Sequence, residues 1–350
     1  MTQLNNIFIG NKVVKQAFLN DALIYQSNGW EPTPSTMQQV FNKQYSEIPN
    51  STSSISVKVD SRGNIISARL KTIYKTNSDG KLLWQKTIFT SNSNFQITSM
   101  VVDRNDNIFC SGDDATFMQI NTSSGEIVKK VDLNSKYRVN SVSAMSVDNN
   151  QIYAMTKPPI NFLKMDFSGN VTSVIPWTSG YKDYVPIAID AGASKHIYAV
   201  VRSLTSNNIY AFRIDKANPN SYVTFVYNEI GYRSDVITDS LANAYVTYAG
   251  TVYKFSPNST GNYIWKVESP FSNHGGSFQE LTVDQQDNIY AFDGYNIYKY
   301  SSDGTFLWKG PEMWQNNNST LTIACDKNNL VVASGYNNNL SKFISLIQTS

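Results

Sequence analysis

The sequence is poor in the side chains that most often carry metal or redox chemistry. Its 350 residues include two cysteines, Cys110 and Cys325, and two histidines, His196 and His274. Two cysteines cannot build a disulfide framework, and their spacing matches no zinc pattern. Two histidines are too few for a multi-histidine metal site. We therefore expect neither a bound metal ion nor a cofactor.

Charge is scarce as well. Asp, Glu, Lys and Arg make up 16% of the chain, against about 25% in ordinary globular domains, and the formal net charge is +2. No block of Lys and Arg forms a stripe that could follow phosphates, so we expect no nucleic-acid partner. No apolar run approaches the ~18 residues of a membrane span, so we expect no membrane insertion. The first residues lack the charged start and apolar core of a signal peptide.

What the sequence has instead is aromatic residues and an internal repeat. Aromatic residues make up 13% of the chain, which with the low net charge is the opposite of a disordered composition. The repeat consists of an alternating run, an Asp-led turn and a second alternating run. It recurs at Asp60, Asp103, Asp148, Asp190, Asp239, Asp284 and Asp326. These positions lie about 42–49 residues apart, a period typical of β-propellers.

The unit that contains Asp284 shows the repeat most clearly. Its four expected strands, named a to d in chain order, cover residues 280–284, 288–292, 296–300 and 306–309. A Ser302-Asp303-Gly304 turn precedes strand d, and Asp-Gly between alternating runs is a strong hairpin signal. The repeats therefore predict an all-β fold, a seven-bladed β-propeller of four-stranded antiparallel blades spanning residues 38–350.

The last unit lacks one strand. It has three expected strands, at residues 321–325, 330–334 and 340–344, and no clear strand d after them. A strand near residues 38–47 can complete this blade from the other end of the chain. Closing the ring in this way leaves no open sheet edge, so we expect these residues to form the missing strand.

The repeats resemble the pyrroloquinoline-quinone-like propeller family, in which Asp-x-x-Gly-Asn, Tyr-Lys and Asp-Gly-x-x-x-Trp recur in each blade. The resemblance covers residues 50–350 and implies the fold rather than a function. Quinone enzymes of that type add adjacent cysteines and a calcium cluster. Cys110 and Cys325 are not adjacent in sequence, so we do not expect quinone chemistry.

A small β module precedes the propeller, over residues 1–31, with a linker at 32–37. It contains two strand–turn–strand units, with Gly10-Asn11 and Asn20-Asp21 as turn residues. So short a segment cannot bury its own core. It should therefore dock on the propeller, on copies of itself in a homo-oligomer, or on another protein. In an alternative interpretation, residues 1–37 simply cap the propeller.

Residues 5–26 resemble the short N-terminal modules of tail and baseplate proteins from phages of Gram-positive bacteria. In those modules an Ile-Tyr-Ile-Gly-like strand is followed by Lys-Val and Leu-Val-Tyr strands. The resemblance implies that residues 1–31 bind other tail or baseplate proteins and that the protein is part of a virion. If this resemblance is set aside, the absence of a signal peptide predicts a cytoplasmic protein.

Several repeated residues have structural interpretations. Asp103-Arg-Asn-Asp106-Asn107 superficially matches a calcium loop but lacks its Gly and distal Glu, so we expect Asp103 to bond its own turn backbone. Three tryptophans share one d-strand position and should pack between blades: Trp84, Trp265 and Trp308. Three lysines follow tyrosines in strand c and are predicted to face solvent: Lys75, Lys254 and Lys299.

Other aromatic residues fall outside the repeat register, in the d-to-a and b-to-c connections, which share one rim of a propeller. The predicted ligand-binding residues are Trp177, Tyr181, Tyr184, Tyr232, His274, Trp314, Asp113, Asp293, Tyr295 and Tyr336. Aromatic rings cover the apolar face of a pyranose, while Asn and Asp bond its hydroxyls. The sequence therefore predicts a phage tail or baseplate-type receptor-binding protein that recognises a host cell-wall saccharide.

Two alternatives stay open. A carbohydrate-active enzyme would need two carboxylates ~5–9.5 Å apart in one pocket. The acids that could approach the rim are Asp113, Asp114, Asp183, Asp235, Glu268 and Asp293. The sequence brings no two of them together, so we name no catalytic residue and favour a non-enzymatic function. The second alternative is a protein-interaction scaffold, because propellers often bind partners on a flat face.

Overall fold

The structure is a computed structural model that describes residues 7–9, 12–14, 16–19, 22–26, 37–44, 56–78, 80–88, 96–148, 151–177, 183–192, 194–230, 234–248, 250–269, 278–294, 296–310, 322–325, 330–337 and 340–348. Within these ranges, side chains are described between residues 56 and 325, apart from 226–230.

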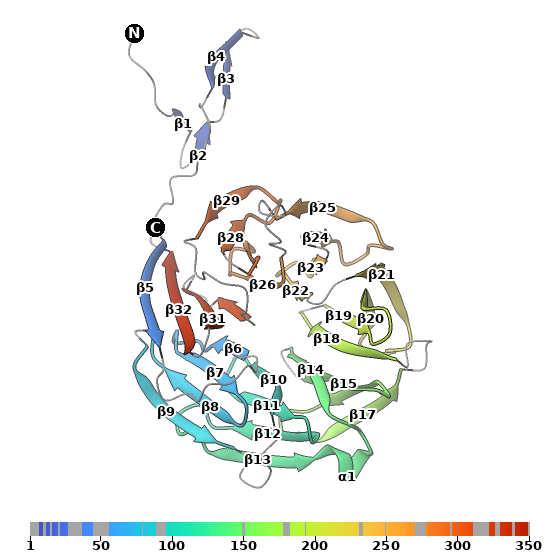
Figure 1. Ribbon diagram of the computed structural model, residues 1–350. Helices are drawn as coiled ribbons and strands as arrows, with labels where there is room; N and C mark the ends of the chain where they lie inside the picture. Colours follow the sequence, from blue (N-terminus) through green and yellow to red (C-terminus); the bar gives the residue numbers. More distant parts are fainter. Residues whose placement is uncertain are drawn as a thin grey trace.

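The chain folds into a β-propeller of four-stranded antiparallel blades around a central axis (Figure 1). Six blades are each built from four consecutive strands. The first two contain β6 (Ser56–Val59), β7 (Ile65–Arg69), β8 (Thr72–Thr76), β9 (Leu82–Thr87), β10 (Ile97–Val102), β11 (Ile108–Gly112), β12 (Thr116–Ile120) and β13 (Ile127–Asp132). The next two contain β14 (Val142–Val147), β15 (Ile152–Thr156), β16 (Asn161–Met165), β17 (Val171–Pro176), β18 (Tyr184–Asp190), β19 (His196–Ser203), β20 (Asn208–Asp215) and β21 (Tyr222–Ile230). The fifth and sixth contain β22 (Val236–Thr238), β23 (Ala244–Tyr248), β24 (Thr251–Phe255), β25 (Tyr263–Glu268), β26 (Glu280–Val283), β27 (Ile289–Phe292), β28 (Ile297–Tyr300) and β29 (Phe306–Lys309).

The hydrophobic core lies between neighbouring blades. Every residue of the b strands β7, β11, β15 and β23 is buried, because each blade is covered on both faces. The d strand β13 instead has exposed and half-buried residues, since it forms the outer edge. One cluster joins Phe109 and Phe117 of the second blade to Leu163 of the third. The four strands predicted around Asp284 are confirmed as β26 to β29.

A further four-stranded sheet is assembled from distant parts of the chain. It contains β30 (Thr322–Cys325), β31 (Leu330–Asn337), β32 (Leu340–Gln348) and β5 (Met37–Gln44). The predicted pairing of the strand near 38–47 with the last sheet is confirmed, because β5 runs antiparallel to β32 with Lys43 opposite Phe343. The side chains of β5, β31 and β32 lie outside the described residues, and the total of seven blades stays a prediction.

Two hairpins form the start of the chain, as the sequence predicted. β1 (Ile7–Ile9) pairs with β2 (Lys12–Val14), and β3 (Gln16–Leu19) pairs with β4 (Ala22–Gln26). Their predicted turn residues and residues 32–36 of the predicted linker lie outside the described residues, while its last residue, Met37, begins β5. The division into an attachment module and a propeller domain stays a prediction.

One short helix interrupts the described strands. This helix, α1 (Leu133–Tyr137), lies in the d-to-a connection after β13, and Asp132 caps its N-terminus by accepting from Ser135 N–H. No helix within the described part of the chain is long and apolar enough to cross a membrane.

Candidate functional site

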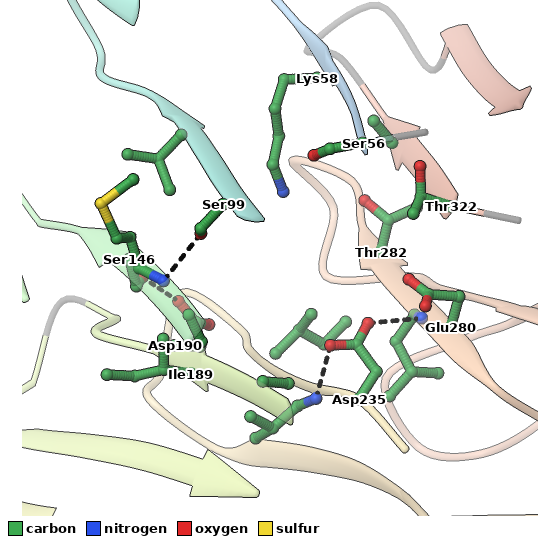
Figure 2. Close-up of a pocket in the computed structure, with 18 of the residues that line it drawn as sticks. Ser56, Lys58, Ser99, Ser146, Ile189, Asp190, Asp235, Glu280, Thr282 and Thr322 are labelled. Carbon is green, nitrogen blue, oxygen red and sulfur yellow. Dashed lines mark hydrogen bonds between the residues drawn. The ribbon is translucent and has the colours of Figure 1, made fainter. Parts of the chain in front are cut away.

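The a strands of the sheets enclose a central channel of about 540 Å³ (Figure 2). Its wall is formed by segments of β6, β10, β14, β18, β22, β26 and β30 and the residues beside them. The polar side chains that face it include Lys58, Ser99, Ser146, Asp190, Asp235, Glu280, Thr282 and Thr322. A concave site in which several polar side chains converge is a place to look for chemistry.

Channel side chains bond the exposed backbone edges of the neighbouring a strands. Met145 N–H donates to Ser99 Oγ of the preceding blade at 2.9 Å, and Leu281 N–H donates to Asp235 Oδ2 at 2.9 Å. Two further bonds of this kind run from Cys325 N–H to Thr282 Oγ1 at 3.1 Å and from Val57 N–H to Thr322 Oγ1 at 3.0 Å. An innermost strand has no partner strand on its inner side, so these side chains satisfy donors that would otherwise be unpaired.

Asp235 is a channel acid whose pKa is raised. Burial raises its pKa to about 6, and the nearby Asp190 carboxylate acts in the same direction. Hydrogen bonds from Leu281 and Val236 N–H and the charge of Lys58 oppose this rise. Such a shift is common at catalytic sites and also in buried structural carboxyls.

Asp190 connects three blades across the channel wall. Its Oδ2 accepts from Thr238 N–H at 2.6 Å and from Thr238 Oγ1 at 2.8 Å, and its Oδ1 accepts from Ser146 Oγ at 3.1 Å. Asp190 also accepts from Gly192 N–H of its own turn at 3.4 Å, so it combines an own-turn bond with bonds to two other blades. Among the described residues, no three His, Cys, Asp or Glu side chains gather to hold a metal ion. Asp190 and Asp235 thus serve as acceptors for backbone and hydroxyl groups.

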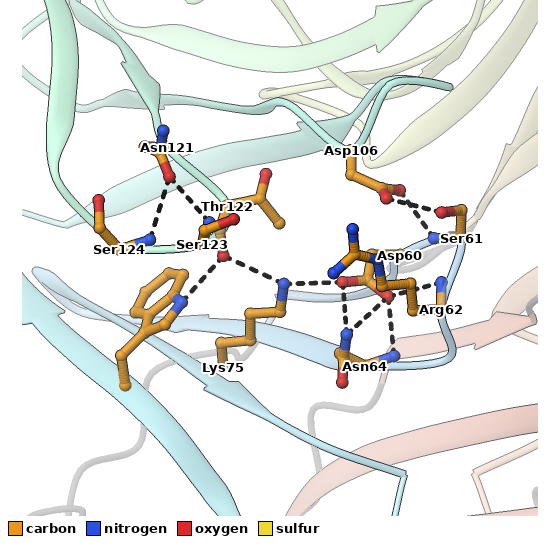
Figure 3. A network of polar contacts seen from close by, with 11 residues as sticks. Asp60, Ser61, Arg62, Asn64, Lys75, Asp106, Asn121, Thr122, Ser123 and Ser124 are labelled. Carbon is orange, nitrogen blue, oxygen red and sulfur yellow. Dashed lines mark hydrogen bonds and ion pairs between the residues drawn. The ribbon is translucent and has the colours of Figure 1, made fainter.

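The rim that carries the a-to-b and c-to-d turns contains polar networks, and Figure 3 shows the one around Asp60. Asp60 Oδ1 accepts from Arg62 N–H at 3.0 Å and from Asn64 N–H at 2.8 Å, which closes its turn. Asp103 binds its own turn in the same way, so the structural interpretation of that acidic loop is confirmed. Burial by itself raises the pKa of Asp60, but bonds from Lys75 and Asn64 outweigh burial and hold that pKa below its ordinary value.

The prediction that the strand-c lysines face solvent is wrong. Lys75, Lys254 and Lys299 are 6%, 7% and 3% exposed. Their ammonium groups lie 2.8 Å from Asp60, 3.5 Å from Asp239 and 3.1 Å from Asp284, respectively. The next blade contacts Lys75 and Lys254, whose ammonium groups donate to Thr122 O and Ser302 O, and strand alternation by itself cannot show that. Lys75 Nζ also donates to Thr122 O at 3.1 Å in the following blade.

Two of the repeat tryptophans, Trp84 and Trp265, lie between blades, as predicted. Trp84 Nε1 donates to Thr122 O of the next blade at 2.9 Å, and Trp265 Nε1 donates to Ser302 O at 3.1 Å. Trp308 is 4% exposed and meets Tyr290 at 5.7 Å between ring centres.

Neighbouring a-to-b turns are also bonded directly to each other. Ser61 donates from its backbone N–H and its hydroxyl to Asp106 of the second blade, at 2.7 and 2.6 Å. Ser240 and Asp287 repeat this pair between the fifth and sixth blades, at 2.9 and 2.6 Å. The sequence analysis missed these contacts, although the spacing of 45 and 47 residues between partners matches the repeat period.

Four of the predicted rim residues have described side chains. Trp177 is 8% exposed and packs edge-on against Phe212 and Tyr222, at 4.9 and 5.8 Å, so neighbouring aromatic rings cover it. Tyr184 is half-buried and packs against Tyr210 at 5.1 Å.

The two predicted acids lie in b-to-c turns. Asp293 is 1% exposed and accepts from Asn296 N–H at 2.8 Å. Asp113 accepts from Gln96 N–H at 3.3 Å. The structure does not bring these four residues into one cavity with the channel. The other predicted residues have side chains outside the described residues: Tyr181, Tyr232, His274, Tyr295, Trp314 and Tyr336.

Comparison with known proteins supports the fold alone. Neither a protein-family model nor a curated protein sequence matches this chain. A streptogramin B lyase structure aligns at 13% identity with a TM-score of 0.65, covering 87% of this chain and 97% of that chain. The β-propeller domain of Cps50 (Swd1) from Myceliophteria thermophila aligns at 12% identity with a TM-score of 0.62, covering 89% and 100%. The WD40 β-propeller domain of Doa1 aligns at 11% identity with a TM-score of 0.61, covering 88% and 96%.

The propeller prediction is therefore confirmed. The resemblances to quinone-type repeats and to phage tail modules gain no support from these comparisons. At such identities a shared fold does not transfer an activity, so the lyase chemistry of one neighbour is not carried over.

Proposed function

We propose that this protein is a protein-interaction scaffold whose partner binds the rim of a-to-b and c-to-d turns. The observation that carries the proposal is the direct bonding between turns of neighbouring blades. Ser61 with Asp106, and Ser240 with Asp287, tie separate turns into one surface. A surface that is already ordered loses little conformational entropy when it binds.

The chemistry of the channel supports the same proposal. Its acidic and hydroxyl side chains accept hydrogen bonds from strand edges, as Asp235 does from Leu281. A catalytic group needs a free acceptor or donor aimed at a substrate. The neighbours add to this, because they include the WD40 propeller domain of Doa1 and a chain of the Mitotic Checkpoint Complex.

The exposed residues of these turns indicate the kind of partner. Arg62 is exposed on the first turn, and Leu241 is 72% exposed on the fifth. Arg and exposed apolar side chains are common anchors of protein interfaces. We therefore expect a partner surface that offers both acidic and apolar groups.

The test is affinity capture from the natural source with the full-length protein as bait. The wild type should retain one protein in stoichiometric amount, and the double variant Arg62→Glu, Leu241→Asp should lose it. The matched control is Leu204→Asp on the opposite rim, which is 57% exposed in the wild type and should leave capture unchanged. Equal capture by wild type and double variant would refute the proposed rim.

The saccharide-binding prediction concerns the other rim and is the competing outcome. In the same assay, the bait is presented with cell-wall polysaccharide. Strong glycan binding without any stoichiometric protein would favour that prediction over the scaffold, and with it the predicted place in a phage tail. The predicted contacts of residues 1–31 with tail or baseplate proteins also stay predictions.

A further inference from the structure

In two blades, the tryptophan of strand d fills the space between that blade and the next. Trp84 lies opposite Lys75 in its blade and Trp265 lies opposite Lys254. In both cases the indole N–H donates to the c-to-d turn of the next blade. The ring fills the space so closely that a Cβ on Gly125 would lie 2.7 Å from Trp84.

The third blade has a serine at this position. Ser173 lies opposite Lys164, in the register that places Trp84 opposite Lys75. A cavity of about 290 Å³ opens here between the third and fourth blades. Its lining residues include Phe162, Ile175, Pro219, Ser173, Lys164 and Lys216.

In the first, fifth and sixth blades, the strand-c lysine pairs with the turn aspartate of its own blade. In the third blade, the turn aspartate Asp148 pairs instead with Lys216 of the fourth blade. Lys216 Nζ lies 2.8 Å from Asp148 and 5.1 Å from the centre of the Tyr153 ring. In the fifth blade, Lys254 lies 5.0 Å from the Tyr245 ring and pairs with its own turn aspartate. Because Lys216 occupies this place, Lys164 has no ion pair with any described residue, and it lines the cavity instead.

The acceptor for an indole N–H is also present. Asp215 and Asn121 hold equivalent places in their c-to-d turns, because Asp215 Oδ1 accepts from Ala217 N–H as Asn121 Oδ1 accepts from Ser123 N–H. Lys216 therefore corresponds to Thr122. The carbonyl of Thr122 accepts from Trp84, whereas no described residue donates to the carbonyl of Lys216.

We propose that this cavity binds an indole-sized aromatic ring that carries a carboxylate. The ring would pack on Phe162 and Ile175, its N–H would donate to Lys216 O, and its carboxylate would pair with Lys164. A cavity of ~150 Å³ is enough to hold benzene, so about 290 Å³ accepts a two-ring system. A free indole carboxylate and a tryptophan beside an acidic residue in a peptide share this chemistry.

The test uses isothermal titration of the full-length protein with indole, indole-3-acetate and a blocked tryptophyl-aspartate dipeptide. The wild type should bind indole-3-acetate or the dipeptide more tightly than indole, and the tighter of the two names the source. Ser173→Trp should abolish binding of all three, because its indole fills the cavity. Lys164→Met should weaken binding of the acidic probes roughly fivefold and leave indole unchanged.

Two further variants serve as controls. Val128→Trp adds an indole at a position that is 59% exposed, on the outer strand of the second blade, and should leave binding unchanged. Trp265→Ser should create a second cavity, where indole raises the melting temperature and a carboxylate gives no added effect, because Lys254 is already paired.

The proposal fails if the wild type binds none of the probes at millimolar concentration, or if Ser173→Trp binds them as the wild type does. If the Trp265→Ser protein folds but gains no indole binding, positions 173 and 265 do not form equivalent indole sites, and that part of the proposal is refuted.

Discussion

Lys299 and Asp284 form the most enclosed ion pair among the described residues, with side chains 4% and 0% exposed. Replacing Lys299 by Met leaves a buried carboxylate without its cation. We expect Lys299→Met to lower the free energy of unfolding by about 3–5 kcal/mol, measured by urea denaturation. Lys266→Met is the control, because its pair with Glu268 is 43% and 67% exposed and should cost less than about 1 kcal/mol. Equal losses of unfolding free energy in the two variants would contradict the claim that the buried ion pair matters more to stability than the exposed one.

Asp235 should make stability depend on pH in a direction opposite to that of most native acids. Burial raises the pKa of its folded-state carboxyl to about 6. Between roughly pH 4 and 6 the folded state therefore holds a proton that the unfolded state has released, so stability falls as pH rises through this window.

Asp235→Asn removes this titration. Relative to the wild type, the variant should gain roughly 2–3 kcal/mol between pH 4 and pH 7, measured from urea midpoints at each pH. Asp60, whose pKa is lowered, acts in the opposite sense but is present in both proteins and cancels in the difference. Parallel pH profiles for the two proteins would show that Asp235 is not perturbed.

At the scale of single elements, the packing of a d strand on the next c-to-d turn depends on glycine. Gly125 has φ of +73°, and a Cβ there would lie 2.7 Å from the Trp84 ring. Gly125→Ala combines an unfavourable backbone conformation with a steric clash, so we expect a loss of about 2–4 kcal/mol in a denaturation experiment. Gly294→Ala also has positive φ, at +95°, but its Cβ would lie 3.6 Å from the nearest atom. Gly294→Ala should therefore lower the free energy of unfolding clearly less than Gly125→Ala does.

Most elements could be predicted from the sequence. The strands around Asp284 follow from alternating residues and turn signals, which act over a few neighbours in the chain. The helix α1 was missed, because five residues with one capping aspartate give little periodic signal. The Asx turns were predicted because the bonds from Asn105 and Asn107 to Asp103 are local.

At the scale of the whole molecule, β5 holds the two ends of the described propeller together. It pairs along β32 from Met37 to Gln44. Deleting residues 1–44 should expose the edge of β32 and replace a single cooperative melting transition by a broad one in scanning calorimetry. Deleting residues 1–31 alone should preserve the single transition. An unchanged melt in the longer deletion would refute closure by this strand.

The candidate site was predicted less well than the fold. Trp177 was selected because it lies outside the repeat register, yet the structure buries it against Phe212 and Tyr222. The same criterion could not find the cavity at Ser173. That cavity lies where Ser173 replaces the strand-d tryptophan of other blades. Its proposed binding role also depends on Lys216, which comes from the adjacent blade.

The sequence by itself determined the strands, the turn aspartates and the repeat period, because these arise from side-chain alternation and hydrogen bonds within a few residues. Only the tertiary structure decided which polar groups are buried. Lys75 is enclosed by a turn of the next blade, near Thr122, and Lys216 takes the place that Lys164 would fill. Such contacts join residues a whole blade apart in the chain, and no local pattern encodes which partner covers them.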